Sequence, residues 1–452
     1  MRRVSIVGAS GFVGQHIINR ISKNSKIAAI SRREKDSNDT NVCWVSTDLF
    51  SLKSTISALQ NTDIAIYLVH SMMPSSRLFQ GDFHDTDLML ADNFARACKK
   101  NNVKQIIYLG GLVPDGFISS HLESRKEVED VLRSTGIPLT ILRAGMIVGN
   151  GGSSFEILKN LVINLPAMIL PNWTKSFTQT IYIDDLIDVL EDSIENPDYY
   201  QKTVNVVNGE ITTYERLIRA MAKFLNKRRI LFPLPINSTS FSKLWVTLFG
   251  HSSYKLVDPL VDSLVCDLPQ VRPDSLIQKH IKHHSFESML ELVDKKKQPM
   301  RKAFRLEDNT VRSIQRLKNH GNLPIDKVAQ EYMTWLPKFF RYFIRVQQEG
   351  TVIHFKVLFL RTPLLTLQHI EETEDIERQK FHIIGGFLTK TVDTGWLEFR
   401  KVSNNRYTLA SINEFVPALP WYIYRYSQAI LHKIVMFRFS SHLRAMPLHK
   451  NN

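Results

Sequence analysis

The feature that most constrains the fold is a glycine-rich stretch near the start of the chain, GASGFVG, covering residues 8–14. The apolar run VSIV precedes it, and the helix-favouring sequence GQHIINRISK follows. Glycines at these spacings allow a tight turn, close approach of a pyrophosphate and close packing of helix on strand, and the helix N-terminus supplies amides for the phosphates. This order predicts a dinucleotide site that includes Gly8, Ser10, Gly11, Phe12, Val13 and Gly14.

Strands and helices continue to alternate after this motif. Apolar runs predict strands over residues 26–30, 42–46, 63–69, 103–109 and 138–142, and a helix over 85–100. Connections of this length between strands are typical of right-handed crossovers in a parallel sheet. We therefore predict an α/β fold, a Rossmann doubly wound parallel sheet with a small cap.

The residues after the second and third predicted strands are expected to meet the adenosine half of the cofactor, and those after the second favour NADP(H) over NAD(H). Ser31, Arg32 and Arg33 stand where NAD-selective folds usually carry an acidic residue for the ribose hydroxyls. An arginine pair suits the additional 2′-phosphate of NADP, and the alternative is that both arginines are solvated loop charges. Asp48 and Leu49, after the third strand, are predicted to meet the adenine.

Several stretches resemble the atypical extended short-chain dehydrogenase/reductases, and in particular the NmrA-like NAD(P)-binding proteins with a C-terminal domain of unknown function. The resemblance covers about the first 290 residues and is carried by GASGFVG, YLVHSM, IIYLGGL, SRKEVEDVLRSTGIPLTILRAGMIVG, SFEILKNLVINLP, TQTIYIDDLIDVL, VNVVNGEITTYERLIRAMAKF and PLVDSLVCD. It implies that the ends of the fourth, fifth and sixth strands meet the cofactor, through Val69, His70, Gly110, Ala144 and Gly145.

The chain departs from this family at the residues for proton transfer. The resemblance implies a Ser after the fifth strand and a Tyr-x-x-x-Lys pair in the next helix, but this chain has two glycines, and then His121 and Arg125. Arg125 can still bind ribose hydroxyls, but its guanidinium stays protonated and cannot adjust the pKa of a tyrosine that this chain lacks. The ordinary histidine pKa, about 6.5, would suit His121 as a proton donor. The favoured interpretation of His121 is a polar residue on a surface loop.

Three functions remain open at this point. The first is an NADPH-dependent oxidoreductase for an apolar quinone-like or carbonyl substrate, working without the usual triad. The second is a non-catalytic NADP-binding sensor or assembly factor, and the third is a lipid-binding or membrane-associated protein acting through the C-terminal domain. Cap segments over about 151–172 and 210–290 carry aromatic residues that either line a pocket or pack as core: Phe155, Trp173, Phe232, Phe241, Trp245 and Phe249.

Charge and composition indicate a second domain. Residues from 295 onward hold 26 Lys and Arg against 13 Asp and Glu, whereas the first 294 hold 32 against 31. We predict an N-terminal domain over 1–294, a linker over 295–302 and a C-terminal domain over 303–452. Its strands are expected at 311–317, 352–360, 366–371, 381–387, 395–402 and 406–415, with a helical stretch over 325–345 broken by Pro337 and a long final helix over 421–443.

This second domain is predicted to be α+β. A curved antiparallel sheet closed by a C-terminal helix is the helix-grip, or START-like, arrangement, and GWLEFRKV and EFVPALPWYIYRYSQAILHKIVMFRFSSHL resemble the family's domain of unknown function. Such a domain encloses an apolar ligand or has a packed core. The final helix is aromatic and basic, so peripheral contact with an anionic membrane is one interpretation. The favoured one is that its apolar face closes the sheet.

Other classes are disfavoured. No uninterrupted apolar run is long enough to span a membrane, and glycines break the apolar N-terminus, which excludes a secretion signal. Three separated cysteines suit a reducing compartment, so we expect a cytoplasmic protein. No nucleic-acid module is evident, and we expect an apolar small-molecule partner instead. His280, His283 and His284 are interpreted as a surface at a helix start, so no metal is expected. The oligomeric state is left open.

Overall fold

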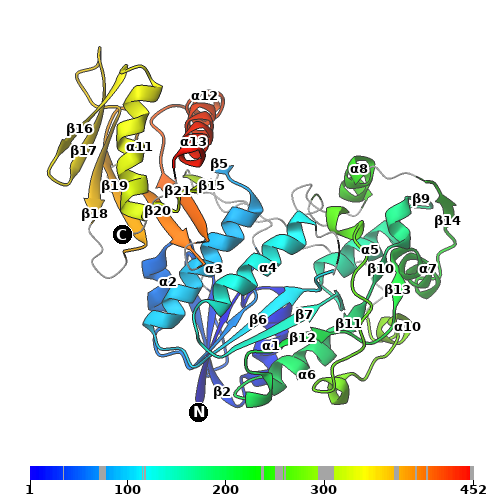
Figure 1. Cartoon of the computed structure of the whole chain (residues 1–452). Coiled ribbons are helices and arrows are strands. Elements are labelled where there is room, and N and C mark those ends of the chain that lie inside the picture. The colour runs from blue at the N-terminus through cyan, green and yellow to red at the C-terminus, as the bar shows by residue number, and fades with distance from the viewer. Residues whose placement is uncertain are drawn as a thin grey trace. The chain divides into compact units, whose positions relative to one another are not determined.

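The computed structural model describes residues 1–33, 35–70, 78–114, 116, 119–235, 239–249, 258, 261–293, 310–370, 376–391, 394–403 and 406–447. Contacts divide the chain into two units (Figure 1). The first contains Met1–Met73 and Asn93–Phe304, and the second contains Pro74–Asp92 and Arg305–Asn452. The predicted linker over 295–302 lies outside the described residues.

The first unit is built on a seven-stranded sheet whose neighbouring strands are all parallel. This confirms the predicted Rossmann sheet. The strand order reverses between β1 and β4, which places a crevice at the carboxyl ends of these two strands. From one edge to the other the strands are β12 (Thr203–Val206), β7 (Leu139–Ala144), β6 (Gln105–Gly111), β4 (Ile64–Tyr67), β1 (Arg2–Val7), β2 (Ser25–Ser31) and β3 (Val42–Ser46).

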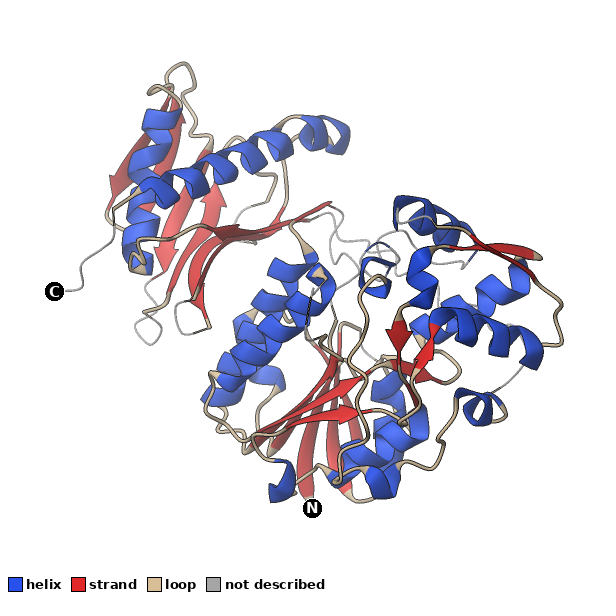
Figure 2. Cartoon of the chain, turned by 45° about the vertical axis from the view of Figure 1, so that its right-hand side comes forward, coloured by secondary structure: helices blue, strands red, loops and turns tan. Residues whose placement is uncertain are grey.

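Helices cover both faces of this sheet (Figures 1 and 2). On one face lie α1 (Phe12–Ile21) and α6 (Ile183–Asp192), whose buried isoleucines and leucines recur at helical spacing and pack on the β-branched residues of the central strands. On the other face lie α2 (Leu52–Ala58), α4 (Ser120–Arg133) and the part of α3 (Phe83–Lys100) that belongs to this unit.

Additional elements of the first unit pack around a separate hydrophobic cluster. In this cluster Phe155 is fully buried and Trp173 is nearly so, which supports core packing for these two aromatics. Phe232 and Phe249 are exposed, and the side chains of Phe241 and Trp245 lie outside the described residues. The helices of this cluster are α5 (Ser153–Asn164), α7 (Tyr214–Phe224), α10 (Phe286–Leu290) and η1 (Asn172–Lys175). Elsewhere in the unit, α8 (Thr239–Phe249) packs on α5, η2 (Pro197–Tyr199) places Tyr199 in the core of the main sheet, and η3 (Gln278–His280) packs on α6.

Three short strand pairs complete the first unit. Two pairs are parallel and one is antiparallel. The pairs are β8 (Met146–Val148) with β11 (Thr180–Tyr182), β9 (Ala167–Leu170) with β14 (Ile230–Pro233), and β10 (Phe177–Thr178) with β13 (Thr212–Thr213).

The second unit is built on an eight-stranded sheet that is antiparallel except at one edge. The first and last long strands of the domain, β15 and β21, are neighbours, and the other strands follow as a meander. In sheet order they are β16 (Ile344–Glu349), β17 (Val352–Val357), β18 (Leu365–Ile370), β19 (Arg378–Gly385), β20 (Trp396–Val402), β21 (Tyr407–Phe415), β15 (Val311–Leu317) and β5 (Leu78–Gln80).

Three helices pack on this sheet: α11 (Ile325–Phe339), α12 (Trp421–Tyr426) and α13 (Gln428–Ala445). Two helix predictions are corrected. Pro337 does not break α11, because it lies in the last turn, and residues 344 and 345, the end of the predicted helical stretch, begin β16. The predicted single final helix is interrupted at Ser427, whose φ of −127° and ψ of −86° are not helical.

The strand β5 and the first half of α3 belong to the second unit, although the sequence analysis assigned them to the N-terminal domain. β5 pairs in parallel with β15. From α3, Asp85 accepts a hydrogen bond from Arg316 Nε at 2.9 Å, and Asp92 accepts one from Arg400 Nη1 at 2.9 Å. Asp92 and Arg400 are both buried, so a segment from early in the chain completes the core of the C-terminal domain.

Candidate functional site

The glycine turn between β1 and α1 has the geometry that a phosphate site requires. Gly8 has a φ of +92°, and a Cβ there would lie 3.1 Å from the carbonyl of Leu68. A Cβ on Gly14 would lie 2.6 Å from Gly8 O, so neither position accepts a side chain without movement. Gly11 N–H donates to Gly8 O at 2.9 Å, and Gly11 is the N-cap of α1. The first-turn amides of α1 therefore begin at the crevice.

The other predicted residues of this motif contribute in different ways. The ring of Phe12 packs on a glycine loop: a Cβ would come within 2.8 Å of it at Gly149 and 3.2 Å at Gly152. Phe12 can thus offer a phosphate only its backbone amide, because its side chain is used in packing. Val13 packs against the core of the sheet, and Ser10 is partly exposed in the turn.

At the carboxyl ends of β2 and β3, the residues predicted for the adenosine lie on adjacent strands. Ser31 ends β2 opposite Ser46 of β3, and its Oγ donates to Arg33 O at 2.5 Å. Arg32 and Arg33 follow with exposed side chains. A third cation, which the sequence analysis did not single out, lies nearby: the Lys35 ammonium is 4.6 Å from the ring of Trp44. Three cations therefore follow β2 within five residues, together with the exposed Asp36.

The loop after β3 is held in a defined turn. Asp48 accepts a hydrogen bond from Phe50 N–H at 3.1 Å, and the carbonyl of Leu49 accepts one from the Asn93 amide at 2.8 Å. Asp48 and Leu49 are both partly exposed. They follow Thr47, whose N–H donates to Ser31 O at the end of β2, and their contact with an adenine stays a prediction.

At the opposite end of the crevice, the strand ends of β4, β6 and β7 lie in consecutive order. Val69 and His70 follow β4 and are partly exposed, and Gly110 lies in β6. Ala144 ends β7 and is buried. A contact within the protein requires a glycine at position 145, because a Cβ there would lie 2.1 Å from the backbone carbonyl oxygen of Gln179.

His121 is not the isolated loop residue that the sequence suggested. Ser119 caps α4 by accepting a hydrogen bond from Leu122 N–H at 3.4 Å, so the helix begins at Ser120 and includes His121 in its first turn. The side chain is 8% exposed, and its ring centroid lies 4.8 Å from that of His70. The structure therefore brings two imidazoles together beside the ends of β4 and β6.

Arg125 lies one turn further along α4 and is partly buried, with Nη1 3.5 Å from Tyr108 Oη. The helix is fixed on the sheet by a bidentate ion pair: Arg143 of β7 donates to Glu129 of α4 at 2.8 and 2.6 Å. These hydrogen bonds to Glu129 raise the pKa of Arg143. α4 thus presents His121 and Arg125 from a helix anchored to the sheet.

Sequence reasoning missed further polar groups near this helix and in α5. Burial raises the pKa of the Cys266 thiol, while hydrogen bonds with Ser119 act in the opposite direction, which places Cys266 beside the α4 N-cap. In α5, Glu156 and Lys159 are both buried, and Glu156 accepts from Gly151 N–H at 3.2 Å. Neither feature follows a recognisable motif, so only the fold reveals them.

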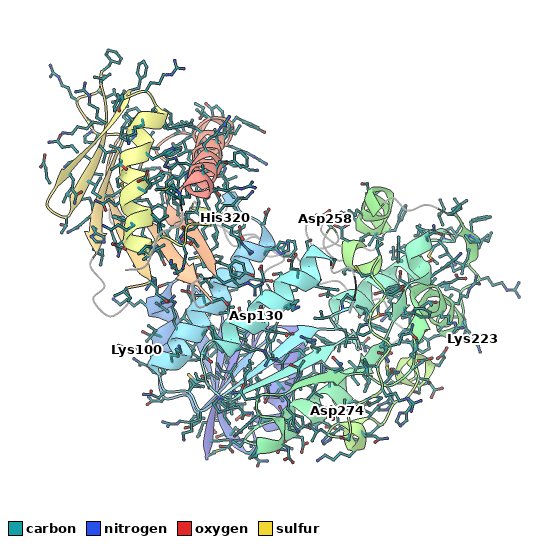
Figure 3. The ribbon with its side chains drawn as sticks, viewed as in Figure 1. Lys100, Asp130, Lys223, Asp258, Asp274 and His320 are labelled. Atoms are coloured by element: carbon teal, nitrogen blue, oxygen red, sulfur yellow. The ribbon has the colours of Figure 1, made fainter. Side chains whose placement is uncertain are left out.

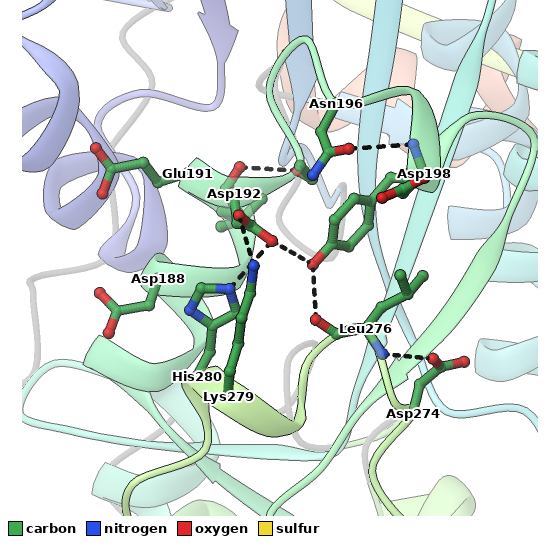
Figure 4. A network of polar contacts seen from close by, with 12 residues as sticks. Asp188, Glu191, Asp192, Asn196, Asp198, Asp274, Leu276, Lys279 and His280 are labelled. Carbon is green, nitrogen blue, oxygen red and sulfur yellow. Dashed lines mark hydrogen bonds and ion pairs between the residues drawn. The ribbon is translucent and has the colours of Figure 1, made fainter.

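The histidine-rich stretch near the end of the first unit is structural. His280 Nε2 lies 3.1 Å from an Asp192 carboxylate oxygen, in a network that also contains Tyr199 and Lys279 (Figure 4). Burial raises the pKa of Tyr199, and its hydrogen bond with Asp192 adds to this effect. His283 Nδ1 similarly contacts the fully buried Asp185 at 3.1 Å. These pairs hold the segment on α6.

Comparisons with known proteins agree with this geometry. Residues 8–161 match a family described as NAD(P)H-binding. The auxiliary protein GraX of Staphylococcus aureus is 30% identical over 111 residues, which are 24% of this chain and only 36% of that protein. A UDP-glucose 4-epimerase of Vibrio cholerae is 20% identical over 296 residues, covering 60% of this chain and 89% of the epimerase.

Two solved structures share the fold of the first unit. A nucleoside-diphosphate-sugar epimerase from Staphylococcus aureus has a TM-score of 0.51 at 19% identity, covering 64% of this chain and all of the epimerase. The triphenylmethane reductase of a Citrobacter species, solved with NADP(H), has a TM-score of 0.50 at 16% identity, covering 64% of this chain and 99% of the reductase. The first unit therefore contains a region that matches an NAD(P)H-binding family, and it shares its fold with an epimerase and a reductase.

Proposed function

We propose that the protein is an NADPH-dependent oxidoreductase that acts on an apolar quinone-like or carbonyl substrate. The observation that carries this proposal is the contact between His70 and His121, whose rings lie 4.8 Å apart. The resemblance stated for the sequence aligns His121 with the helix position from which short-chain dehydrogenases donate a proton, and burial of the side chain supports a fixed position for it. An anchored imidazole beside the predicted nicotinamide end supplies an acid where the usual tyrosine is missing.

In this proposal each group of the chain has a separate task. The bound cofactor would supply a hydride. Arg125 would hydrogen-bond the ribose hydroxyls, and the Arg143–Glu129 pair keeps its helix in place. His121, protonated, would give its proton to the substrate oxygen that gains negative charge as the hydride arrives, and water would then reprotonate the ring. Hydride and proton together complete a two-electron reduction.

The proposal includes a preference for NADP(H). The support is the exposed pair Arg32 and Arg33 at the end of β2, with Lys35 adding a third positive charge nearby. Guanidinium groups bind a phosphate dianion through charge-assisted hydrogen bonds, and Arg32 and Arg33 directly follow β2, ahead of the exposed Asp36. The 2′-phosphate would therefore be favoured over a free ribose hydroxyl.

The test is NADPH consumption by the full-length protein, followed by absorbance across a panel of quinones, dyes and aldehydes. We expect turnover of at least one apolar acceptor, with NADPH faster than NADH. Tight NADPH binding in calorimetry without turnover of any acceptor would contradict the oxidoreductase and favour the alternative, an NADP-binding sensor or assembly factor. That alternative has its own support, because glycines replace the family's serine at the end of β6.

For the second unit we propose the helix-grip, or START-like, arrangement. The support is its topology: β15 pairs with β21, the strands between them form a meander, and the long α13 packs on the sheet. Its core is filled by aromatic and aliphatic side chains, including Tyr332, Trp335, Phe399 and Phe439. These packed rings favour a domain with a solid core over one that encloses a large ligand.

A further inference from the structure

The helices α12 and α13 are apolar on two faces, and only one face is used for packing. Tyr424, Val435, Met436, Phe439 and Leu443 are buried in the core of the second unit. That packing accounts for the interpretation favoured from the sequence, in which the helix closes the sheet. It leaves a second set of large apolar side chains without a role in the fold.

This second set forms an exposed stripe. Tyr422, Tyr426 and Phe437 are 70%, 72% and 66% exposed. Within α13, Ile430, Ile434 and Phe437 follow one line at spacings of four and three residues, while Tyr422 and Tyr426 lie in α12; Ile423 and Leu431 are also exposed. Scattered surface hydrophobics are ordinary, but an aromatic and aliphatic stripe shared by two consecutive helices marks an interaction surface.

The charged side chains of α12 and α13 themselves are all positive, and the acidic partner from a neighbouring element is Glu331 of α11, 2.8 Å from His442. The chain contains no Asp or Glu after Glu414, whereas Arg425, Lys433, Arg438 and Arg444 are exposed. On a helix with 3.6 residues per turn, Lys433 and Arg438 fall on opposite flanks of the line through Ile430, Ile434 and Phe437. A partner that fits this surface must therefore offer an apolar layer bordered by negative charge.

We propose that the face formed by Tyr422, Tyr426, Ile430, Ile434 and Phe437 lies on the surface of a membrane that contains anionic lipids. Tyrosines suit the boundary between headgroups and acyl chains, the aliphatic groups enter the outer part of the acyl layer, and the flanking cations contact lipid phosphates. This is surface contact only: within the described parts of the chain, every helix is too short or too polar to cross a membrane. A second copy of the chain fits less well, since two such faces would bring their cations together.

The test is flotation of the full-length protein with vesicles of phosphatidylcholine, prepared with and without phosphatidylglycerol. We expect binding only to the anionic vesicles and release by added salt. The double variants Tyr426→Ser with Phe437→Ser, and Lys433→Glu with Arg438→Glu, should each weaken binding by about tenfold or more. All four residues are exposed, so the melting temperature should not change.

Matched controls come from the first unit, where Ile230 and Phe232 are similarly exposed and Lys227 and Arg228 are surface cations. Ile230→Ser with Phe232→Ser, and Lys227→Glu with Arg228→Glu, should bind vesicles like the wild type. No binding to anionic vesicles, or equal loss in the controls, would overturn the proposal. So would a dimer in light scattering that Phe437→Ser dissociates, because the stripe would then be a contact between copies.

Discussion

The rings of His70 and His121 lie 4.8 Å apart, one following β4 and the other in the first turn of α4. If His121 is the proton donor, His121→Phe should keep a ring against His70 and remove the acid. We expect turnover to fall about a hundredfold or more while NADPH affinity stays within twofold. The rate of the wild type should fall as pH rises past the pKa of the donor, and steady-state kinetics over a pH series measures both effects.

The exposed His320 in the second unit gives the control for this substitution (Figure 3). His320→Phe should leave both turnover and its pH profile unchanged. Unchanged turnover in His121→Phe would show that the histidine pair is only a packing contact. The reductase would then need another proton source, and the sensor would become the better proposal.

Arg125 gives a second prediction, because its partly buried guanidinium extends from α4 toward the end of β6, where it meets Tyr108. If it binds the ribose, Arg125→Ala should weaken NADP binding by about 1.5–3 kcal/mol, the cost of a lost charged hydrogen bond. Arg125→Lys should recover much of that loss. Lys126→Ala, at the exposed neighbouring position, should have no effect in the same calorimetric titration. Unaltered affinity in Arg125→Ala would place the nicotinamide elsewhere.

A third prediction concerns cofactor choice. Replacing Arg32 and Arg33 with Ala should weaken NADPH binding by about tenfold to a hundredfold, the order of one charged hydrogen bond, and leave NADH binding unchanged. Lys26→Ala is the matched control, since Lys26 is an exposed cation at the other end of β2. The measurement is the affinity of each variant for both cofactors. An equal loss for NADH and NADPH would mean that the arginines act without regard to the 2′-phosphate.

The parts of the fold that local sequence determines were predictable, and the parts that depend on distant contacts were not. The glycine turn was predictable because Gly14 is required by contacts with Gly8 and Ala9 within one strand–turn–helix unit, and the φ of +92° at Gly8 belongs to the same turn. β5 has only three residues and forms by pairing with β15, so no local pattern indicates it. The contact of His121 with His70 likewise depends on how α4 packs beside the end of β4, which spacing along the chain does not encode.

The fourth prediction tests the segment that completes the second unit. Arg400 is buried between Asp92 of α3 and Glu398 of β20, and Arg378 also donates to Glu398, at 2.9 Å. Asp92→Asn removes one charge from this network and leaves Arg400 incompletely neutralised. We expect a loss of about 3–5 kcal/mol in the free energy of unfolding, as for other broken buried ion pairs. Urea unfolding followed by circular dichroism measures it.

Asp82→Asn is the control for Asp92→Asn, because Asp82 lies in the same segment but is exposed. It should change the stability by less than about 0.5 kcal/mol. Equal effects of the two substitutions would argue that residues 78–92 do not contribute to the core of the second unit. The division of the chain would then follow the boundary predicted from the charge asymmetry.

The last prediction is a pH dependence of stability that comes from His432 in α13. Its Nε2 lies 3.2 Å from Ser313 Oγ in β15, and burial lowers the pKa of the ring from 6.5 to about 4. Because the folded-state pKa is the lower one, the unfolded chain takes up a proton first as the pH falls. The contribution of neutral His432 is therefore complete above pH 6.5 and is lost progressively down to about pH 4.

His432→Gln keeps a hydrogen-bonding group there and cannot titrate, so its urea midpoint should fall less than that of the wild type across this window. When the midpoints are converted into free energies of unfolding, the two plots against pH should differ in slope by up to about 1.4 kcal/mol per pH unit, the value for one proton. His320→Gln should run parallel to the wild type, and a His432→Gln curve that also runs parallel would show that the ring is hydrated in the folded protein.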